Sequence, residues 1–246
     1  MNISGIPKTS LLGRLIRYPL RFIPKNAAVP ILQGSFRGKK WIVGSANHGY
    51  WLGSYEFKKR LLFERSIPQG SVVYDVGGFV GYYTLLASVL VGESGRVVVF
   101  EPLPNNLHYL KEHLRLNGIA NVTVVEAAVS DKSETLLFKE GPSRAMGKLA
   151  KDGGLQVQAV SLDDLVERGE LPEPQYMKVD VEGAEMRAFT GSRRLMERCH
   201  PTIFLDTHGS EVHEMCCRYL TELGYRLEAI DGKELRESKE IFAVYK

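Results

Sequence analysis

The sequence predicts an α/β fold in which a mostly parallel β-sheet is covered by helices on both faces. From residue 70 onward, short apolar runs rich in β-branched residues alternate with segments of helical periodicity, the pattern of parallel strands joined by helical crossovers. A short turn signal separates the last two apolar runs and indicates a closing antiparallel hairpin. With 246 residues, 44% of them hydrophobic, the chain can bury the core of one large domain, or of one domain with an added lobe.

Seven apolar runs are expected to form the strands of the main sheet. The dipeptide Asp231-Gly232 is a turn signal between the last two, which predicts that they form a hairpin. In chain order the runs are Ser71–Val76, Arg96–Phe100, Val122–Val125, Tyr176–Val181, Thr202–Leu205, Arg226–Ile230 and Ile241–Tyr245.

Four longer segments are expected to be helices between these strands. Three glycines precede the first, and Asn117-Gly118 is a stop signal after the second. The expected helices are Tyr82–Val91, Pro104–Leu116, a segment that begins at Ala184, and Ser210–Leu223.

The middle of the chain is less regular. Residues Asp131–Leu155 show no clear period and are expected to hold a hairpin. Val157–Val160 reads as a short strand, and Leu162–Glu167 as a helical turn capped by Ser161.

The first 65 residues differ in composition from the rest, being rich in Arg, Lys, Pro and Gly and containing both tryptophans. We interpret residues 1–65 as an N-terminal extension with a short strand at Trp41–Val43, and residues 66–246 as the main domain. Within residues 10–23, Ser10 can cap a short amphipathic helix that has arginines on its polar face. Such a helix packs on its own domain or on a partner, or rests on an anionic membrane surface.

Charge and cysteine content narrow the class of protein. The net charge of +3, with acids and bases interspersed, does not predict a nucleic-acid partner. The odd number of cysteines, three, fits neither a disulfide framework nor a zinc site, so we expect reduced thiols and a cytoplasmic protein. No run of about 18 apolar residues predicts a membrane-spanning helix.

The strongest local signal is the glycine-rich loop Asp75–Gly81, between a predicted strand and a predicted helix. Glycines permit the tight turn and allow a ligand to approach the backbone. Glu101, about 25 residues after Asp75, ends the next strand, where an acid faces the ribose hydroxyls of a nucleoside ligand. The pair predicts a nucleoside-binding site.

The spacing of this loop favours S-adenosylmethionine over NAD. It reads D-x-G-G-x-x-G rather than the dinucleotide fingerprint G-x-G-x-x-G. The carboxylate of Asp75 suits the ammonium of S-adenosylmethionine and would repel a pyrophosphate. Seven strands ending in a hairpin is also the layout of S-adenosylmethionine-dependent methyltransferases.

Several segments, taken in order, resemble the FkbM-like methyltransferases. The most telling is Lys178–Glu185, which reads KVDVEGAE and joins the fourth strand to its helix. The others are Trp51–Glu56, Asp75–Thr84, Phe100–Asn106 and Glu126–Asp131. The resemblance covers roughly residues 50 to 245. It implies a Rossmann-like class I methyltransferase fold, with a seven-stranded mostly parallel sheet, helices on both faces and an antiparallel closing strand.

The resemblance also implies a role for individual residues. Glu101, followed by Pro102, would hold the ribose, and Ala127 and Ala128 would lie near the adenine. Glu56 would reach the cofactor from outside the sheet. The residues that would shape the methionine side are Asp75, Gly77, Gly78 and Gly81. The family loop usually reads Gly-Ala-Asn where this chain has Gly77-Gly78-Phe79, so an asparagine amide is replaced by an aromatic ring.

Acidic residues at the end of the fourth strand are the candidates for catalysis. Asp180 and Glu182 lie where ligands bind in open α/β sheets, and His208 follows the fifth strand. A hydroxyl acceptor needs its proton removed by a base or a metal, and the candidate groups are these three side chains and Asp206. Alternatively, Lys178 and the acids form a structural ion pair, and His208 is idle. An Asp/Glu magnesium site is a weaker alternative, but the spacing does not define its ligands, so no metal ligands are assigned. His108 and His113 are expected on the surface.

Three functions are compatible with these patterns. The first is a methyltransferase that acts on a hydroxyl of a small molecule, a sugar or a glycolipid, so that the acceptor is carbohydrate or lipid-linked. The second is an NAD-dependent oxidoreductase, and the third a non-catalytic module with the same fold, which the Phe79 substitution favours. The acceptor pocket is expected to involve residues 1–65 and 131–155. A homo-oligomer is compatible with the sequence.

Overall fold

The computed structural model describes residues 18–140, 147–149 and 154–246. Of the amphipathic segment, residues 10–17 therefore lie outside the described residues. Its remainder contains the 3-10 helix η2 (Pro19–Phe22), with the side chains of Tyr18 and Phe22 exposed. Within the described parts, no helix combines the length and the apolar character needed to cross a bilayer.

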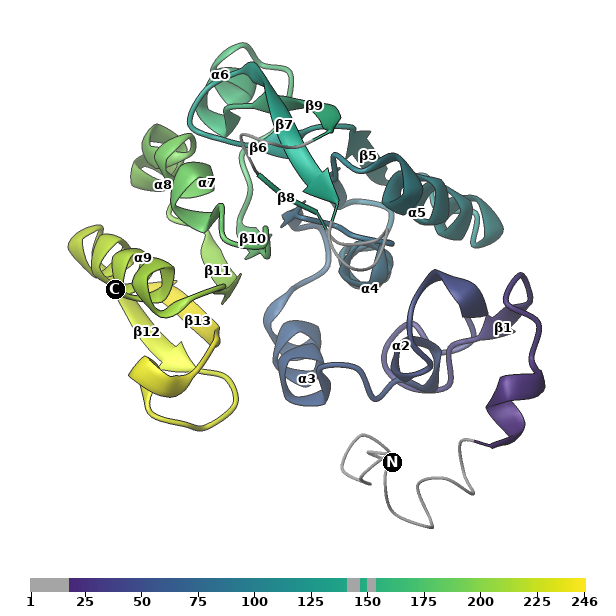
Figure 1. Cartoon of the computed structure of the whole chain (residues 1–246). Helices are drawn as coiled ribbons and strands as arrows, with labels where there is room; N and C mark the ends of the chain where they lie inside the picture. Colours follow the sequence, from purple (N-terminus) through teal and green to yellow (C-terminus); the bar gives the residue numbers. More distant parts are fainter. Residues whose placement is uncertain (1–17, 141–146, 150–153) are drawn as a thin grey trace.

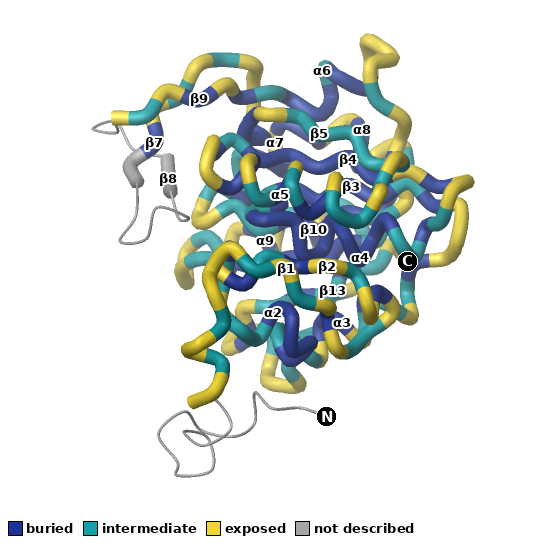
Figure 2. Tube along the Cα trace, turned by 90° about the vertical axis from the view of Figure 1, so that its right-hand side faces the viewer, coloured by how far each residue is buried: buried dark blue, intermediate teal, exposed yellow. Residues whose placement is uncertain are grey.

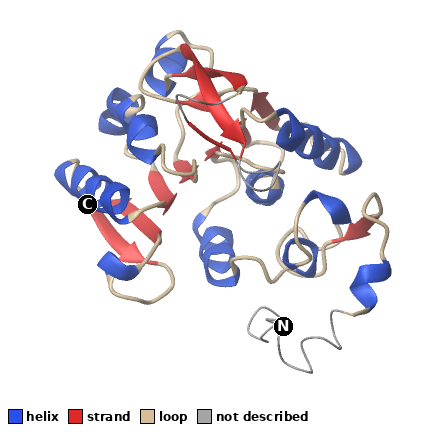
Figure 3. Ribbon diagram, in the orientation of Figure 1, coloured by secondary structure: helices blue, strands red, loops and turns tan. Residues whose placement is uncertain are grey.

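A seven-stranded sheet forms the centre of the molecule (Figure 3), as the sequence predicts. The strand order is β12-β13-β11-β10-β3-β4-β5, and only β13 runs antiparallel to its neighbours. Strand ends are in register, since Val76 of β3 pairs with Val179 of β10 and with Phe100 of β4. The strands are β3 (Val72–Val76), β4 (Arg96–Phe100), β5 (Val122–Val125), β10 (Tyr176–Val179), β11 (Thr202–Asp206), β12 (Tyr225–Ala229) and β13 (Glu240–Tyr245).

Helices cover both faces of this sheet (Figure 1). Alternate strand residues point to opposite faces, so Tyr74 and Val98 pack in one core cluster and Val73 and Val97 in the other. The first face carries α6 (Leu162–Glu167), α7 (Glu185–Thr190), α8 (Arg193–Cys199) and α9 (Ser210–Glu222). The second carries α3 (Phe57–Ser66), α4 (Tyr82–Val91) and α5 (Pro104–Leu116). The central strands β3, β4 and β10 are almost entirely buried (Figure 2).

Two predicted boundaries after the fourth strand are wrong, for local reasons. The strand ends at Val179 instead of Val181, because Glu182 and Gly183 have φ angles of +51° and +97°. The helix expected from Ala184 is split into α7 and α8 at Gly191. A Cβ at this glycine would lie 1.9 Å from the Ser130 carbonyl oxygen, so the helix break packs closely against another loop.

A second, four-stranded sheet lies above the first in Figure 1 and is missing from the sequence analysis. Its order is β6-β9-β7-β8, formed by β6 (Ala128–Val129), β7 (Glu134–Glu140), β8 (Gly147–Leu149) and β9 (Leu155–Val160). The antiparallel pair of β7 and β8 confirms the expected hairpin, although strand β9 begins earlier than predicted. The cap of α6 by Ser161 is confirmed, since its hydroxyl accepts from the Asp164 amide.

The N-terminal extension packs on the face that carries α4. Its strands β1 (Ala28–Pro30) and β2 (Lys40–Ile42) pair antiparallel, followed by η3 (Val43–Ser45) and α2 (Gly49–Leu52). The Trp41 side chain is fully buried and contacts Tyr82 of α4 edge to face. The extension therefore shares its hydrophobic core with the main sheet.

His113 is buried, so its expected surface position is wrong. Its Nε2 accepts from the Ile42 amide at 3.0 Å, which leaves the proton on Nδ1 to donate to the Val80 carbonyl at 2.8 Å. The ring stacks on Trp41, with centroids 3.9 Å apart. Burial lowers the pKa of His113 to about 4. A neutral imidazole thus ties the N-terminal extension to α5.

Replacement of His113 by phenylalanine should keep the stacking but remove both hydrogen bonds. Because the Ile42 amide and the Val80 carbonyl would be left unpaired, we expect the free energy of unfolding to fall by about 1–3 kcal/mol. Urea unfolding measures this. The exposed His108 on the same helix provides the control, and His108→Phe should change stability by less than about 0.5 kcal/mol. Equal effects of the two substitutions would contradict the prediction.

Candidate functional site

A cavity of ≈ 280 Å³ lies at the carboxyl ends of β3, β4 and β10. The glycine-rich loop and the segment after β10 form two of its walls. The N-terminal extension contributes Tyr50 and Tyr55, and the second sheet contributes Phe138. This is the edge of an open α/β sheet at which ligands bind.

Eight of the twelve predicted site residues line this cavity, and four lie beside it. Those in the lining are Asp75, Gly77, Gly78, Glu101, Pro102, Ala128, Asp180 and Glu182. Gly81 is the residue that precedes α4, and Ala127 is buried next to Ala128. Glu56 lies behind Tyr83, whose hydroxyl donates to it at 3.0 Å. His208 contacts Asp180 and Glu182, the two acids that follow β10.

Glycines are required in the loop because neighbouring segments approach it closely. A Cβ on Gly77 would lie 1.9 Å from the Asp180 carbonyl oxygen, and one on Gly78 would lie 2.2 Å from a Val99 methyl group. Both amides donate to the Phe100 carbonyl, at 2.9 and 3.0 Å. The loop is thus held against β4 and β10, beside the cavity.

Glu101 is the acid that fixes this loop. Its Oε2 accepts from the Phe79 amide at 2.8 Å, and its Oε1 accepts from the Leu103 amide at 2.9 Å and from Asn106 at 3.1 Å. The residue is 4% exposed, and burial raises its pKa to about 7 despite these donors. Glu101 therefore changes its charge near neutral pH in the ligand-free protein.

Phe79 occupies a backbone conformation that suits asparagine or glycine. Its φ angle is +52°, in the left-handed region. The ring lines the cavity, and its centroid lies 6.3 Å from that of Tyr50. A phenylalanine in this conformation costs roughly 1–2 kcal/mol.

Asp75 is held inside the protein at the start of the loop. Its Oδ2 accepts from the Thr84 hydroxyl at 2.6 Å, and its Oδ1 lies 3.9 Å from Lys178 Nζ. Within the described part of the chain, Oδ1 has no hydrogen-bond partner. Burial raises the pKa of Asp75, and Lys178 opposes that shift. One carboxylate oxygen of the cavity wall is thus left for a donor.

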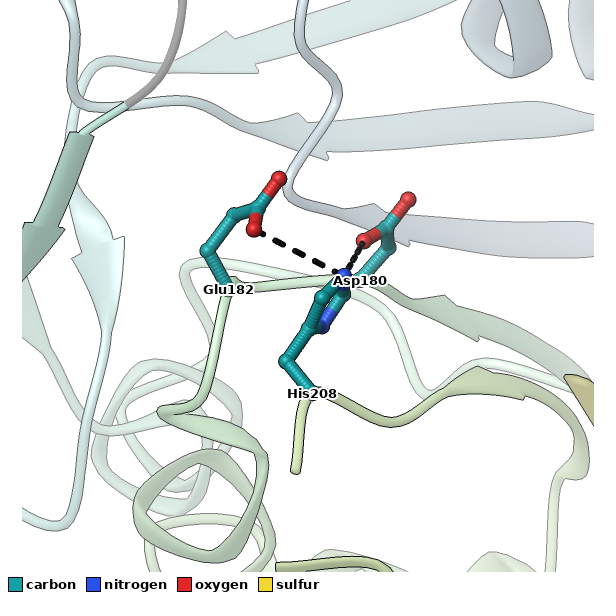
Figure 4. A group of neighbouring side chains, drawn as sticks. All are labelled: Asp180, Glu182 and His208. Atoms are coloured by element: carbon teal, nitrogen blue, oxygen red, sulfur yellow. Dashed lines mark ion pairs between the residues drawn. The ribbon is translucent and has the colours of Figure 1, made fainter. Parts of the chain in front are cut away.

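Asp180 and Glu182, which line the cavity, come together with His208 beside it, and Figure 4 shows the three side chains. His208 Nε2 lies 3.7 Å from Asp180 Oδ1 and 3.6 Å from Glu182 Oε2. Lys178 Nζ contacts the other Asp180 oxygen at 3.2 Å. Burial opposes the ionisation of Asp180, but Lys178 and other nearby cations lower its pKa, so the carboxylate is charged.

A buried carboxylate behind His208 controls the charge of this ring. Glu185, at the start of α7, is fully buried, and its Oε1 lies 2.8 Å from His208 Nδ1. This hydrogen bond raises the pKa of His208 to about 9. His208 is therefore an imidazolium at neutral pH in the ligand-free protein, whereas the sequence analysis assumed an ordinary pKa suited to a base.

A second ionic cluster, which the sequence analysis missed, ties α3 to the end of the sheet. Lys59 Nζ lies 2.5 Å from Glu56, 2.7 Å from Asp206 and 3.2 Å from Glu240, and its side chain is fully buried. Burial raises the pKa of Asp206 to about 7, although Lys59 opposes this. Asp206, one of the candidate bases, is thus already paired with an ammonium.

Four features of the site have no clear signal in the sequence. Tyr50 precedes the Trp51–Glu56 motif and Tyr55 belongs to it, and the motif indicates a segment of interest but no contact. Phe138 belongs to the irregular middle of the chain. Glu185 reads as a helix-start acid, and only its position behind His208 reveals what it touches.

Comparison with known proteins relates this site to methyltransferases. A family model described as the methyltransferase FkbM domain matches residues 75–227, from the first residue of the glycine-rich loop into β12. Hexuronic acid methyltransferase AglP of Haloferax volcanii is 32% identical over 141 residues, which cover 56% of this chain and 56% of that protein. Protein-L-isoaspartate O-methyltransferase of Fervidobacterium nodosum is 31% identical over 101 residues, 37% of this chain and 50% of that protein.

The chain thus aligns with about half the length of these curated relatives. Among solved structures, methyltransferase FkbM from Methylobacillus flagellatus superposes with a TM-score of 0.52 at 16% identity, over 81% of this chain and 56% of that one. At this identity the similarity establishes the fold, which is the Rossmann-like class I methyltransferase fold.

Proposed function

This chain belongs to the FkbM family of methyltransferases, whose cofactor is S-adenosylmethionine, and we propose that it transfers a methyl group to a hydroxyl of a sugar or sugar-containing molecule. The observation that carries the proposal is one cavity that joins the glycine-rich loop and Glu101 to the acids Asp180 and Glu182. The relative named hexuronic acid methyltransferase supports a sugar acceptor.

The side chains of the cavity fit S-adenosylmethionine in three places. Glu101 supplies carboxylate oxygens where the ribose hydroxyls are expected, at the end of β4. Ala128, Leu103 and Phe138 give an apolar wall for the adenine. The Asp75 carboxyl in the cavity lining suits the ammonium of the methionine part.

The chain's own contribution to the reaction is alignment and proton removal. When bound, the cofactor supplies an electrophilic methyl group on a sulfonium. Lys178 holds Asp180 in place, and Asp180 and Glu182 present carboxylate oxygens to the acceptor end of the cavity. A hydroxyl positioned there can pass its proton to a carboxylate as its oxygen attacks the methyl group. An amine acceptor would not need this base, so the paired acids favour oxygen as the acceptor atom.

A non-catalytic module is the second candidate, and one observation favours it. Phe79 replaces the usual asparagine of the family loop in a strained conformation and lines the cavity. Cofactor binding without turnover on any acceptor would support this alternative. The third candidate, an NAD-dependent oxidoreductase, requires binding of NAD.

Calorimetric titration of the full chain with S-adenosylhomocysteine, and separately with NAD, tests the cofactor. We expect micromolar binding of the first ligand and none of the second. Turnover is then tested by S-adenosylhomocysteine release with glucuronic acid, glucose and a simple amine as acceptors. Methylation of the amine alone, or binding of NAD alone, would overturn the proposal.

Replacement of Phe79 by asparagine is expected to tighten S-adenosylhomocysteine binding by roughly 3- to 10-fold. Asparagine tolerates a positive φ, and its amide can hydrogen-bond the amino-acid end of the ligand. The dissociation constant measures the effect. Phe79→Ala is the control, because it removes the ring but keeps the strain. If both substitutions change the affinity equally, the conformation and the amide are not the cause.

A further inference from the structure

We propose that Asp180, Glu182 and His208 bind a divalent cation at the acceptor end of the cavity. The inference rests on the proposed function for its role in catalysis, since the cation would hold the acceptor hydroxyl next to the cofactor. As a binding site it rests on geometry alone.

The three side chains have the spacing of a cation site. Oxygen and nitrogen ligands about 2.1 Å from one cation are roughly 3.0–3.6 Å apart when they subtend 90–120° at it. His208 Nε2 lies 3.6 Å from Glu182 Oε2 and 3.7 Å from Asp180 Oδ1, and all three ligand atoms lie within 4.8 Å of one another. Figure 4 shows both carboxylates directed toward the ring nitrogen. The side chains are 25%, 41% and 34% exposed for Asp180, Glu182 and His208, so a hydrated ion can reach them.

Glu185 provides independent support from outside the ligand set. Metal-binding histidines commonly donate their other ring nitrogen to a carboxylate, which fixes the ring and leaves the free nitrogen for the metal. Glu185 is fully buried and directed at His208, with Oε1 2.8 Å from Nδ1. Its Oε2 has no hydrogen-bond partner within the described residues. A buried carboxylate behind His208 therefore orients the ring, and Nε2 is left as the ring nitrogen that faces Asp180 and Glu182.

The neighbouring acidic cluster shows how this fold neutralises such a group. Glu56, Asp206 and Glu240 also lie close enough to share an ion, but Lys59 Nζ already sits among them. At the proposed site, Lys178 contacts Asp180 alone and is the one lysine or arginine of the described chain that does so. One triplet thus surrounds an ammonium, whereas in the other no lysine of the described residues lies among the three ligand atoms, and Asp180 and Glu182 line the cavity.

Two carboxylates and one imidazole suit a first-row divalent ion such as Mn²⁺. In the proposed reaction, the acceptor oxygen binds to the ion and its O–H bond breaks, with the proton passing to the carboxylate oxygen of Glu182 that does not bind the ion. The oxygen lone pair then forms the new O–CH₃ bond as the C–S bond breaks. The electron pair of that bond stays on sulfur, which gives S-adenosylhomocysteine.

Titration of the full chain with Mn²⁺, followed by the electron paramagnetic resonance signal of free Mn²⁺, tests the site. We expect one ion per chain, and at least 10-fold weaker binding in Glu182→Gln and in His208→Ala. Glu182 is the most exposed ligand, so its substitution is not expected to affect folding. Glu240→Gln, in the Lys59 cluster, is the matched control and should leave the affinity unchanged.

S-adenosylhomocysteine binding to the same proteins, measured with EDTA present, separates this proposal from the methyltransferase assignment. If the chain binds S-adenosylhomocysteine but no Mn²⁺, the cation site is overturned and the proposed function stays intact. The same holds if Glu240→Gln weakens Mn²⁺ binding as much as the ligand substitutions do. If Mn²⁺ binding is lost only in Glu182→Gln and His208→Ala, and the unsubstituted chain does not bind S-adenosylhomocysteine, the cation site is upheld and the proposed function is overturned.

Discussion

Replacement of Lys59 by methionine is expected to lower the free energy of unfolding by about 3–5 kcal/mol. The ammonium is fully buried and lies within 3.2 Å of oxygens of Glu56, Asp206 and Glu240. Methionine has a similar length but no charge, so it would leave three carboxylates close together without a cation. Removing one partner of a buried ionic group is costly because the remaining charges stay desolvated. Urea unfolding at pH 8 measures the loss.

The pH dependence of this loss identifies its cause. Burial raises the pKa of Asp206 to about 7, and removal of Lys59 would raise it further. As the pH falls through this range, protonation relieves the repulsion in the variant, so its deficit should be smaller at pH 6 than at pH 8.

Lys111→Met is the matched control, because Lys111 pairs with Glu126 at 2.7 Å with both side chains about half exposed. It should cost less than about 1 kcal/mol. A Lys59→Met loss as small as that of the control would show that the cluster contributes little.

Features set by local sequence were predicted well. Helices α4 and α5 have the predicted bounds, because glycines and an Asn-Gly stop signal surround clear helical patterns. The glycine-rich loop and Glu101 were likewise recognisable, since a strand-loop-helix pattern and the spacing to the next strand end carry the information.

Features set by contacts distant in sequence were missed or wrong. Lys59 lies on a helix that also carries the exposed charges of Lys58 and Arg65, and its principal partner, Asp206, is 147 residues away. His113 has the helical context of a surface residue, and only the docking of β2 buries it. The second sheet escaped notice because its strands pair across an irregular segment, so no single run predicts it.

Replacement of Glu101 by glutamine is expected to weaken S-adenosylhomocysteine binding by roughly 30- to 150-fold at pH 8. Hydrogen bonds to a charged acceptor contribute about 1.5–3 kcal/mol each, and a factor of ten corresponds to about 1.4 kcal/mol. The amide would keep one acceptor oxygen but place an NH₂ group against the backbone donors of Phe79 or Leu103. Loss of ribose contacts and loosening of the loop therefore act in the same direction.

A second buried carboxylate separates these ligand effects from general destabilisation. Asp163 is 6% exposed and accepts from the backbone amides of Arg194 and Leu195 at 3.1 and 2.8 Å, away from the cavity. Asp163→Asn should destabilise the fold in the same way as Glu101→Gln but leave S-adenosylhomocysteine affinity within about 2-fold. Equal losses of affinity would mean that Glu101 acts only through stability.

The affinity of the unsubstituted chain should also depend on pH, and the sign follows from the raised pKa of Glu101. Burial places this pKa at about 7, so below pH 7 the free protein carries a protonated carboxyl. Ribose hydroxyls donate to the carboxylate, and binding must then release that proton, so the affinity should fall by up to about 10-fold per pH unit below 7. Above pH 7 the proton is already gone, and the dependence of the affinity on pH should level off.

Glu101→Gln is the control, because its side chain cannot titrate. Its weak affinity, measured by calorimetry, should be nearly flat between pH 5.5 and 8. A wild-type affinity that is equally flat would contradict the prediction that Glu101 loses a proton when the ribose binds.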